Sequence, residues 1–532
     1  MFSLKGIIME NGKEQISLEE LLYYILFAVI SFSKGVGLDE GELLFRVCLL
    51  VGIMLLACKF LIGKYSILEI VIAGVMGIWG IFTFKITGSL GMFIYIILII
   101  GMKNVPVKRV FITGAAVWGS CMFFSAAGAV FAGRTGVRIV HERFGMGPIL
   151  RESLGYTHPN VLHITYALFM TFLLYLYIEN KKKILYVICL LLLGNVYVFM
   201  YSMSSTGTLM TIALLVLFIY FDKRKRLSKT ESLLIQGMPL LCVMFSIVLP
   251  LALRDGVFYE KLNRLFHSRI WAVIYFFDRY KITLFGSGSE GMDFSIDNSY
   301  VGALHSYGLI PLIIMIVVYS FLLRYYIKRN GRKELAVICT FLFAGLSEPF
   351  LFNASIKNIT VIFIGHFLYE MTQNGNNIFT PFSKYNYLFS FPCDIWAKMR
   401  GSLSEIKWKR VILAGAVSGI VCFLFLLPGN QFQIEKVYGE ESLCDVRGDT
   451  LRLPKPPVME KTLYIENISE DVNYYCFTNE NSHLIEVMDL RYKISVSLYA
   501  AAIAGMLYAC GQLYLCRLKG KRAVISIYED KS

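Results

Sequence analysis

Charged residues are scarce in this chain of 532 residues, because Lys, Arg, Asp and Glu together make up only 17% of it. Hydrophobic residues make up 56%, and the mean hydropathy is +0.60. A water-soluble protein of this size cannot bury so much apolar surface, whereas a bilayer can solvate it. The apolar runs are also too long for a β-barrel, which has short alternating segments. The composition therefore predicts an all-α polytopic membrane protein.

Clustered metal ligands are also missing from the sequence. The 12 cysteines are scattered singly, and neither a CxxC nor a CxxxH spacing occurs. Most of the cysteines lie in apolar runs, where cysteine behaves as a small hydrophobic residue. We therefore expect no metal site.

A cleavable signal peptide is not expected either. The first apolar run has no basic region directly before it and no small-residue cleavage site after it. A span needs about 20 apolar residues, or fewer where flanking residues reach the interface. About fourteen runs qualify, near residues 16–33, 43–62, 67–84, 89–102, 110–131, 160–179, 184–201, 206–221, 233–252, 299–323, 334–350, 357–372, 411–428 and 495–516.

Lys and Arg clusters orient these spans, since basic residues collect on the cytoplasmic side. With this number of spans, six basic clusters fall on one side: residues 103–109, 180–183, 222–229, 324–333, 373–410 and 516–522. The chain is thus expected in the cell membrane with both termini cytoplasmic. The net charge of +14 follows from these anchors and is no evidence for nucleic-acid binding.

The polar segments expected outside the cell are then residues 132–159, 201–208, 253–298 and 347–358. The first carries Arg134, Arg138 and Arg151, and a basic outer loop runs against the usual trend. Arginine suits phosphate because its planar fork bonds two oxygens at once. Headgroup anchoring and local ion pairs are alternative roles. His158 follows in THPN as a further candidate, and Pro159 suits the first turn of a helix.

Residues 259–280, inside the long outer segment, have helical periodicity with an apolar stripe. This pattern is typical of an interfacial helix that lies on the membrane. Alternatively, Arg254, Arg264 and Arg269 face a cavity and hold an anionic head group. Residues 285–293 are rich in Gly and Ser and could act as a lid.

Two further outer segments hold candidate residues. The hydroxyl cluster SMSSTGT at 202–208 is more typical of backbone or helix–helix hydrogen bonds than of a site. Glu348 lies at the outer end of a span, beside Pro349, where a carboxylate should face protein or water rather than lipid. We therefore treat Glu348 as a catalytic candidate.

The stretch DNSYVGALH, residues 297–305, begins like a capped helix, because Asp297, Asn298 and Ser299 are typical N-cap residues. Capping does not explain His305. On a helix, Asn298, Gly302 and His305 share one face, and this face could wall a cavity. A carboxylate or imidazole there could take a proton from an attacking hydroxyl.

Three stretches resemble the bacterial O-antigen and capsule polymerases known as Wzy proteins. They are RESLGYTHPNVLH (151–163), FGSGSEGMDFSIDNSYVGALHSYGLIPL (285–312) and GLSEPFLFNASIKNITVIFIG (345–365). The resemblance covers roughly residues 110–370. The stretches occur in the family's order and on the expected outer side. The related O-antigen ligases share the fold and the segment ahead of the span.

The resemblance implies a GT-C-like glycosyltransferase that uses undecaprenyl-diphosphate-linked sugars at the outer face. A polymerase of this type moves the growing glycan from its lipid carrier onto a lipid-linked repeat unit, without a metal or other cofactor. The implied catalytic residues are Asp297, His305 and Glu348. The implied diphosphate- or substrate-binding residues are Arg134, Arg138, Arg151, His158, Asn160, Arg254, Arg264, Arg269 and Asn298. A chain-length regulator and a flippase are the implied partners.

The chain departs from the family pattern at two sites. Many relatives carry His where this chain has Asp297, so the base is either Asp297 or His305. The turn SMSSTGTLM lacks the arginine that often follows its serine, so one phosphate contact is either absent or supplied by residues 132–159.

The expected organisation is N-terminal spans (1–109), a polymerase-like core (110–372), a cytoplasmic linker (373–410), two spans around an outer domain (411–516) and a tail (517–532). The outer domain, 429–493, looks β-rich and lies outside the usual core. Cys444 and Cys476 both lie in it, on the oxidising side, where a disulfide can form.

Two other functions fit parts of the sequence. One is an O-antigen-ligase-like transferase with another acceptor. The other is a flippase for lipid-linked oligosaccharides, which should carry midplane charges and two similar halves. We find no convincing internal repeat, and the polar residues gather in outer segments, so the sequence favours the polymerase.

Overall fold

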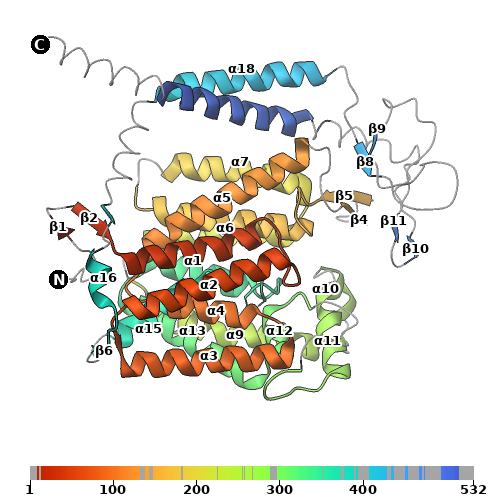
Figure 1. Ribbon diagram of the computed structural model, residues 1–532. Coiled ribbons are helices and arrows are strands. Elements are labelled where there is room, and N and C mark those ends of the chain that lie inside the picture. Colours follow the sequence, from red (N-terminus) through yellow and green to blue (C-terminus); the bar gives the residue numbers. More distant parts are fainter. Residues whose placement is uncertain are drawn as a thin grey trace, which may run out of the picture. The chain divides into compact units, whose positions relative to one another are not determined.

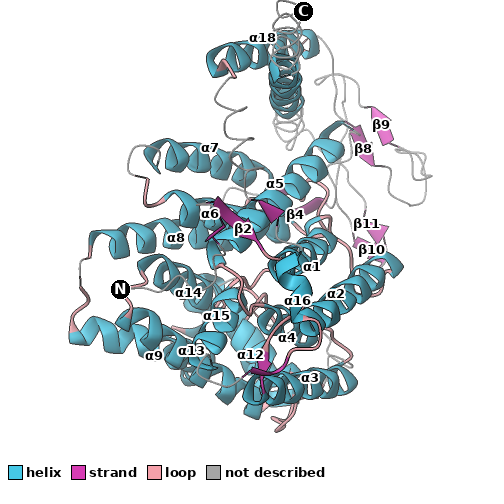
Figure 2. Cartoon of the chain, turned by 60° about the vertical axis from the view of Figure 1, so that its left-hand side comes forward, coloured by secondary structure: helices cyan, strands magenta, loops and turns pink. Residues whose placement is uncertain are grey.

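The structure, a computed structural model, describes most of the helical part of the chain. The described residues are 9–10, 13–131, 138–142, 148–180, 184–224, 226–254, 256, 258–265, 268–287, 296–351, 353–372, 377–388, 391–392, 406–427, 433–435, 450–452, 467–469, 472–473, 490 and 493–513. Nearly all of their regular structure is helical, and the strands are short (Figure 2).

Ten of the described helices are long and apolar enough to cross a membrane. They are α2 (Leu43–Ile62), α3 (Ile67–Thr87), α5 (Val107–Phe131), α6 (Pro159–Tyr177), α7 (Ile184–Ser202), α8 (Ser205–Lys223), α9 (Lys229–Leu253), α13 (Leu309–Lys328), α18 (Trp408–Leu426) and Lys493–Leu513. Large apolar side chains are exposed on these helices, and so much exposed apolar surface would be unfavourable in water. The prediction of a polytopic, mostly helical membrane protein is confirmed.

Four further helices stand where the sequence predicts spans but are shorter or more charged. They are α1 (Leu18–Gly35), α4 (Gly91–Gly101), α14 (Arg332–Ala344) and α15 (Thr360–Thr372). Nearly every residue of α4 and most residues of α14 are buried, which is typical of a helix enclosed by others. In Figure 1, α1 to α4 run in nearly the same direction; α4 packs on α3 and α15, and α14 packs on α8.

The predicted span 299–323 is broken into two helices, α12 (Ser299–Ser306) and α13. The break lies at Gly308, whose φ of +93° favours glycine. A Cβ on Gly308 would lie 2.4 Å from the backbone nitrogen of Gly286, so the connecting segment can approach only here. The backbone N–H groups of Leu309 and Ile310 donate to the carbonyls of Thr283 and Leu284. This contact ties the segment before α12 to the start of α13.

The predicted helix 259–280 is also two helices, α10 (Tyr259–Leu265) and α11 (Arg269–Arg279). Its apolar side packs on the protein itself. Val273 and Phe276 lie in one buried cluster with Ile296 and Val301, and α11 packs on α9. The stripe that resembles an interfacial helix therefore fixes α11 against α9 and α12.

Short antiparallel strand pairs make up the rest of the described regular structure. They are β1 (Met9–Glu10) with β2 (Lys13–Ile16), β3 (Tyr65–Ser66) with β6 (Asn377–Phe379), β4 (Arg138–Glu142) with β5 (Pro148–Glu152), β8 (Gln433–Glu435) with β9 (Thr450–Arg452), and β10 (Asn467–Ser469) with β11 (Val472–Asn473). Helix α16 (Ser383–Leu388) and β7 (Phe391–Pro392) lie in the linker. The β4–β5 hairpin was not among the sequence predictions, and β8 to β11 lie in the segment 429–493.

The chain divides into two compact units. The first comprises residues 1–8, 15–122 and 160–391, and the second comprises residues 9–14, 123–159 and 392–532. Buried ion pairs join helix ends in the first unit. Arg109 Nη1 lies 2.6 Å from Glu20 Oε2, and Lys103 pairs with Glu69. Such pairs are stable only where their remaining donors are also bonded.

Candidate active site

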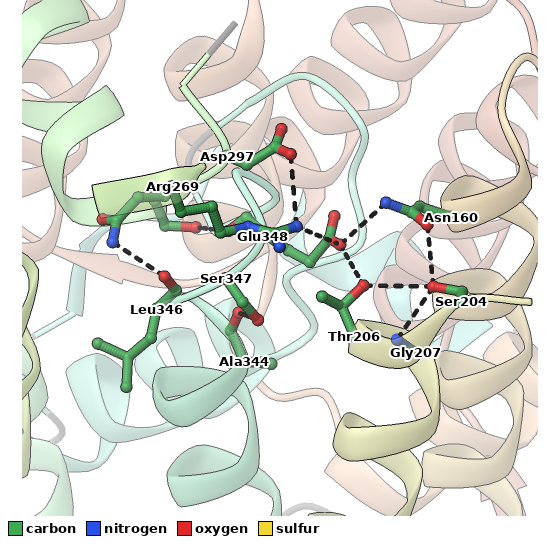
Figure 3. Close-up of polar contacts among 12 residues, drawn as sticks. Asn160, Ser204, Thr206, Gly207, Arg269, Asp297, Ala344, Leu346, Ser347 and Glu348 are labelled. Carbon is green, nitrogen blue, oxygen red and sulfur yellow. Dashed lines mark hydrogen bonds and ion pairs between the residues drawn. The ribbon is translucent and has the colours of Figure 1, made fainter. Parts of the chain in front are cut away.

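Glu348 is the centre of a polar cluster in the first unit. It lies between α14 and α15, and its side chain is only 8% exposed. Its Oε1 atom accepts hydrogen bonds from Thr206 Oγ1 at 2.5 Å and from Asn160 Nδ2 at 3.4 Å (Figure 3). Both bonds fall on one carboxylate oxygen, and the described residues donate none to Oε2. A buried carboxylate in which one oxygen accepts no hydrogen bond is typical of a functional site rather than of a structural contact.

The hydroxyl cluster at the start of α8 supplies one wall of this site. Ser204 caps the helix by accepting a hydrogen bond from the N–H of Gly207 at 3.2 Å. The same hydroxyl donates to Asn160 Oδ1 at 2.9 Å and lies 3.2 Å from Thr206 Oγ1. The cluster therefore has the predicted structural role and, in addition, holds the two residues that bond Glu348.

Behind this wall, the buried imidazole of His163 locks α6 to α7. Its Nδ1 atom lies 2.9 Å from Ser202 Oγ, and its Nε2 atom lies 3.0 Å from Asn195 Oδ1. Helix α8 approaches so closely that a Cβ on Gly207 would lie 2.4 Å from the ring. The sequence analysis did not identify His163, although it lies one turn after Asn160 in THPNVLH.

Asn298 is the predicted N-cap of α12, and the structure confirms this role. Its Oδ1 atom accepts from the N–H groups of Tyr300 and Val301 at 2.9 and 3.1 Å. Its Nδ2 atom donates to Ser246 Oγ and to the carbonyl of Leu346, both at 2.9 Å. One side chain therefore caps α12 and also ties it to α9 and to the Glu348 segment.

Ser299 completes this junction. Its N–H donates to the carbonyl of Gly345 at 2.8 Å, and its hydroxyl donates to the carbonyl of Glu348 at 2.5 Å. The N–H of Leu351 donates back to the same hydroxyl at 3.2 Å. Because the two segments share these bonds, Asp297 is held beside Glu348.

Arg269 is the first residue of α11 and lies between two carboxylates. Its Nη2 atom is 3.4 Å from Asp297 Oδ2 and 3.9 Å from Glu348 Oε1 (Figure 3). Its Nε atom is buried and finds no hydrogen-bond acceptor among the described residues. A guanidinium has five N–H donors, so Arg269 retains donors for an anion. Asp297 is the more open carboxylate, with a side chain that is 44% exposed.

Burial decides the protonation of both carboxyl groups. Burial, and to a smaller extent the neighbouring charge of Asp297, raises the pKa of Glu348 from 4.5 to about 7. The Thr206 hydrogen bond and the charges of Arg269 and Lys357 oppose this shift. Burial also raises the pKa of Asp297, with Arg269 opposing. Burial therefore shifts the pKa of both carboxyl groups in the same direction, upward.

The other predicted base, His305, lies at the far end of α12. Seven residues separate it from Asn298, which is roughly 10 Å along a helix. Its Nδ1 atom lies 3.2 Å from Ser287 Oγ, and its ring packs edge-on against Phe276 and Tyr280 at 5.3 and 5.4 Å. This aromatic surrounding gives His305 a packing role beside the segment 283–287.

The structure describes three of the remaining predicted residues. Arg254 pairs with Asp278 at 2.6 Å on the surface. Arg151, on β5, is buried within the second unit, as is the adjacent Glu152. His158 lies in the turn before α6 in the same unit. Five predictions lie outside the described residues or side chains: Arg134, Arg138, Arg264, Cys444 and Cys476.

Within the described part of the chain, no group of three or more His, Cys, Asp or Glu side chains could hold a metal ion. The cluster instead offers two carboxylates, one guanidinium and a set of hydroxyl and amide groups. Comparison with known proteins adds nothing to this assignment, since no family model, curated protein or solved structure matches the chain.

Proposed function

We propose that the protein is a polysaccharide repeat-unit polymerase at the outer face of the cell membrane. It would transfer a growing glycan from undecaprenyl diphosphate onto a lipid-linked repeat unit. The observation that carries this proposal is the position of Arg269. Its guanidinium is partly buried between Asp297 and Glu348, and its Nε atom has no hydrogen-bond acceptor among the described residues. This arrangement supplies an anion-binding group and a proton acceptor side by side.

The reaction can be assigned to these three residues. The acceptor hydroxyl attacks the anomeric carbon of the donor glycan, and the bond from that carbon to the diphosphate oxygen breaks. The diphosphate leaves with the electron pair, and Arg269 stabilises its growing charge. The carboxylate of Asp297, the more exposed acid, takes the proton of the hydroxyl. Glu348 holds Arg269 from the other side, so it is a positioning residue.

The donor is already activated by its diphosphate, so this chemistry calls for no nucleotide sugar or other cofactor. The cluster combines segments from four places in the chain, all expected on the outer side of the membrane. A ligase-like transferase would use the same chemistry with a different acceptor. The two differ in product, because a polymerase makes a ladder of repeat units and a ligase makes one attachment.

Complementation separates Asp297 from His305 as the base. In a strain that lacks this gene, wild-type protein should restore a ladder of long surface glycans on a gel. We expect Asp297→Asn to lower polymerisation by about 10²-fold or more, leaving single repeat units, since the amide cannot accept the proton. His305→Gln should restore the ladder, because His305 packs between aromatic rings rather than beside Arg269.

Protein levels must match between the strains for this comparison. A ladder from Asp297→Asn together with none from His305→Gln would reverse the assignment of the base. Accumulation of lipid-linked repeat units on the cytoplasmic face in the deletion strain would contradict the enzyme and support a flippase.

A further inference from the structure

The segment that carries Glu348 also contains a strained residue. Ile356 has a φ of +57°, a conformation that β-branched residues rarely adopt, and it is only 3% exposed. Such strain persists only where the surroundings hold the backbone in place, and it concentrates at binding and catalytic sites. The residue that this conformation positions is its neighbour, Lys357.

Hydrogen bonds fix the backbone on the far side of Lys357. Asn358 Nδ2 donates to the carbonyl of Leu351 at 2.8 Å and to Tyr319 Oη at 3.0 Å. Asn358 Oδ1 accepts from the N–H of Thr360 at 3.2 Å, at the start of α15. Lys357 is therefore held between a strained residue and a fully bonded asparagine, and its direction is fixed by the fold.

The ammonium of Lys357 is buried and poorly bonded. The residue is 6% exposed, although a lysine near a surface usually extends its charge into water. Among the described residues, its one hydrogen bond is to the carbonyl of Val161 at 3.5 Å. An ammonium has three donors. Burial lowers the pKa of Lys357 to about 8, and the nearby charge of Glu348 opposes this shift.

A structural lysine elsewhere in the first unit is bonded much better. Lys59 is fully buried, and its Nζ atom donates to the carbonyls of Glu19 and Lys103 at 3.1 and 2.8 Å. It also lies 3.9 Å from Glu19 Oε1. The fold thus satisfies a buried ammonium where that ammonium joins helices, whereas Lys357 keeps unused donors at the start of α6.

We propose that Lys357 is the second cation of the active site and binds the diphosphate of the lipid-linked substrate together with Arg269. Arg269 lies 3.9 Å from Glu348 Oε1, and Lys357 bonds the carbonyl of Val161, the chain neighbour of Asn160, which donates to the same oxygen of Glu348. Both cations retain donors. Two cations match a group with two phosphates better than a single phosphate. The identification of the anion as a diphosphate rests on the proposed function. The existence of an anion site that depends on Lys357 does not.

Binding of prenyl phosphates tests this proposal on the purified full-length chain in uncharged detergent. The probes are farnesyl diphosphate, farnesyl monophosphate and farnesol. We expect wild-type protein to bind the diphosphate more tightly than the monophosphate. Lys357→Met should weaken diphosphate binding at least 10-fold, and Lys357→Arg should restore most of it. Thermal unfolding should show that Lys357→Met is no less stable than wild type, whereas the matched control Lys59→Met is destabilised.

Several outcomes would overturn the proposal. They are no binding of the diphosphate by wild type, unchanged binding by Lys357→Met, and equal affinity of wild type for monophosphate and diphosphate, which would indicate a general headgroup site. If neither Lys357→Met nor Lys357→Gln folds, Lys357 is a structural cation and the proposal fails. Lys357-dependent diphosphate binding without glycan lengthening would leave this inference standing and contradict the polymerase.

Discussion

Replacement of Arg269 by methionine is expected to lower the rate of glycan lengthening by about 10³-fold, the usual effect of removing one group that stabilises a leaving anion. Arg269→Lys should recover only part of this loss, because an ammonium cannot bond two oxygens in the geometry of a guanidinium. The measurement is the rate at which purified protein extends a lipid-linked repeat unit.

The matched control for this experiment is Arg279→Met, at the other end of α11. Arg279 is exposed and stacks on the ring of Tyr275 at 4.8 Å. Its removal should change the rate by less than about twofold, as is usual for surface substitutions away from a site. Equal losses from Arg269→Met and Arg279→Met would show that α11 acts only through its packing.

Replacement of Glu348 by glutamine is expected to change how the stability of the protein depends on pH. The pKa of Glu348 is about 7 in the folded protein and 4.5 when unperturbed. Because the folded state binds this proton more tightly, its contribution to stability is complete below pH 4.5 and is lost as pH rises to about 7. Glutamine cannot ionise, so the variant should keep that stability at high pH.

The shift corresponds to about 3 kcal/mol, so Glu348→Gln should unfold at a clearly higher temperature than wild type at pH 8 and at a similar temperature at pH 5. Thermal unfolding in detergent across this range measures the effect. Glu370→Gln is the control, since Glu370 pairs with Arg329 away from the cluster. Parallel pH curves for wild type and Glu348→Gln would contradict the burial of an ionisable Glu348.

The membrane class and the positions of most helices could be predicted from the sequence, because apolar runs of about 20 residues match the thickness of a bilayer. The N-cap at Asn298 was predictable because capping depends on local residues. The broken helix at Gly308 was not, since the break is required by the approach of Gly286, a contact that no periodicity reports. The β4–β5 hairpin was not predicted, because its arginines were interpreted by their charge and not by the pairing of the two strands.

The residues of the candidate site were only partly predictable. Glu348 stood out as an acid at the end of a span, and Asp297 as an acid before a helix. Asn298 caps one end of α12 and His305 lies near the other, and a helical wheel does not show which segment covers each end. Which of the candidate arginines in residues 253–298 lies at the site depends on the packing of α11, so only the structure separates Arg269 from Arg254.

Lys357 and Thr206 show a second limit. Lys357 lies in SEPFLFNASIKN and Thr206 lies in SMSSTGT. Both stretches were predicted to be polar outer segments, but neither residue was predicted to belong to the site. Their significance depends on burial and on the position of Glu348, which are tertiary properties. The sequence signal for Lys357 was a single lysine in a segment expected on the outer side, against the positive-inside trend.

The most direct measurement is made on purified wild-type protein in a bilayer nanodisc supplied with undecaprenyl-diphosphate-linked repeat units. We expect glycans of two or more repeat units on the lipid, with one free undecaprenyl diphosphate released for each new linkage. Both products should form about 10³-fold more slowly with Arg269→Met. Unchanged single repeat units, with wild-type protein folded and bound to the substrate, would contradict the polymerase.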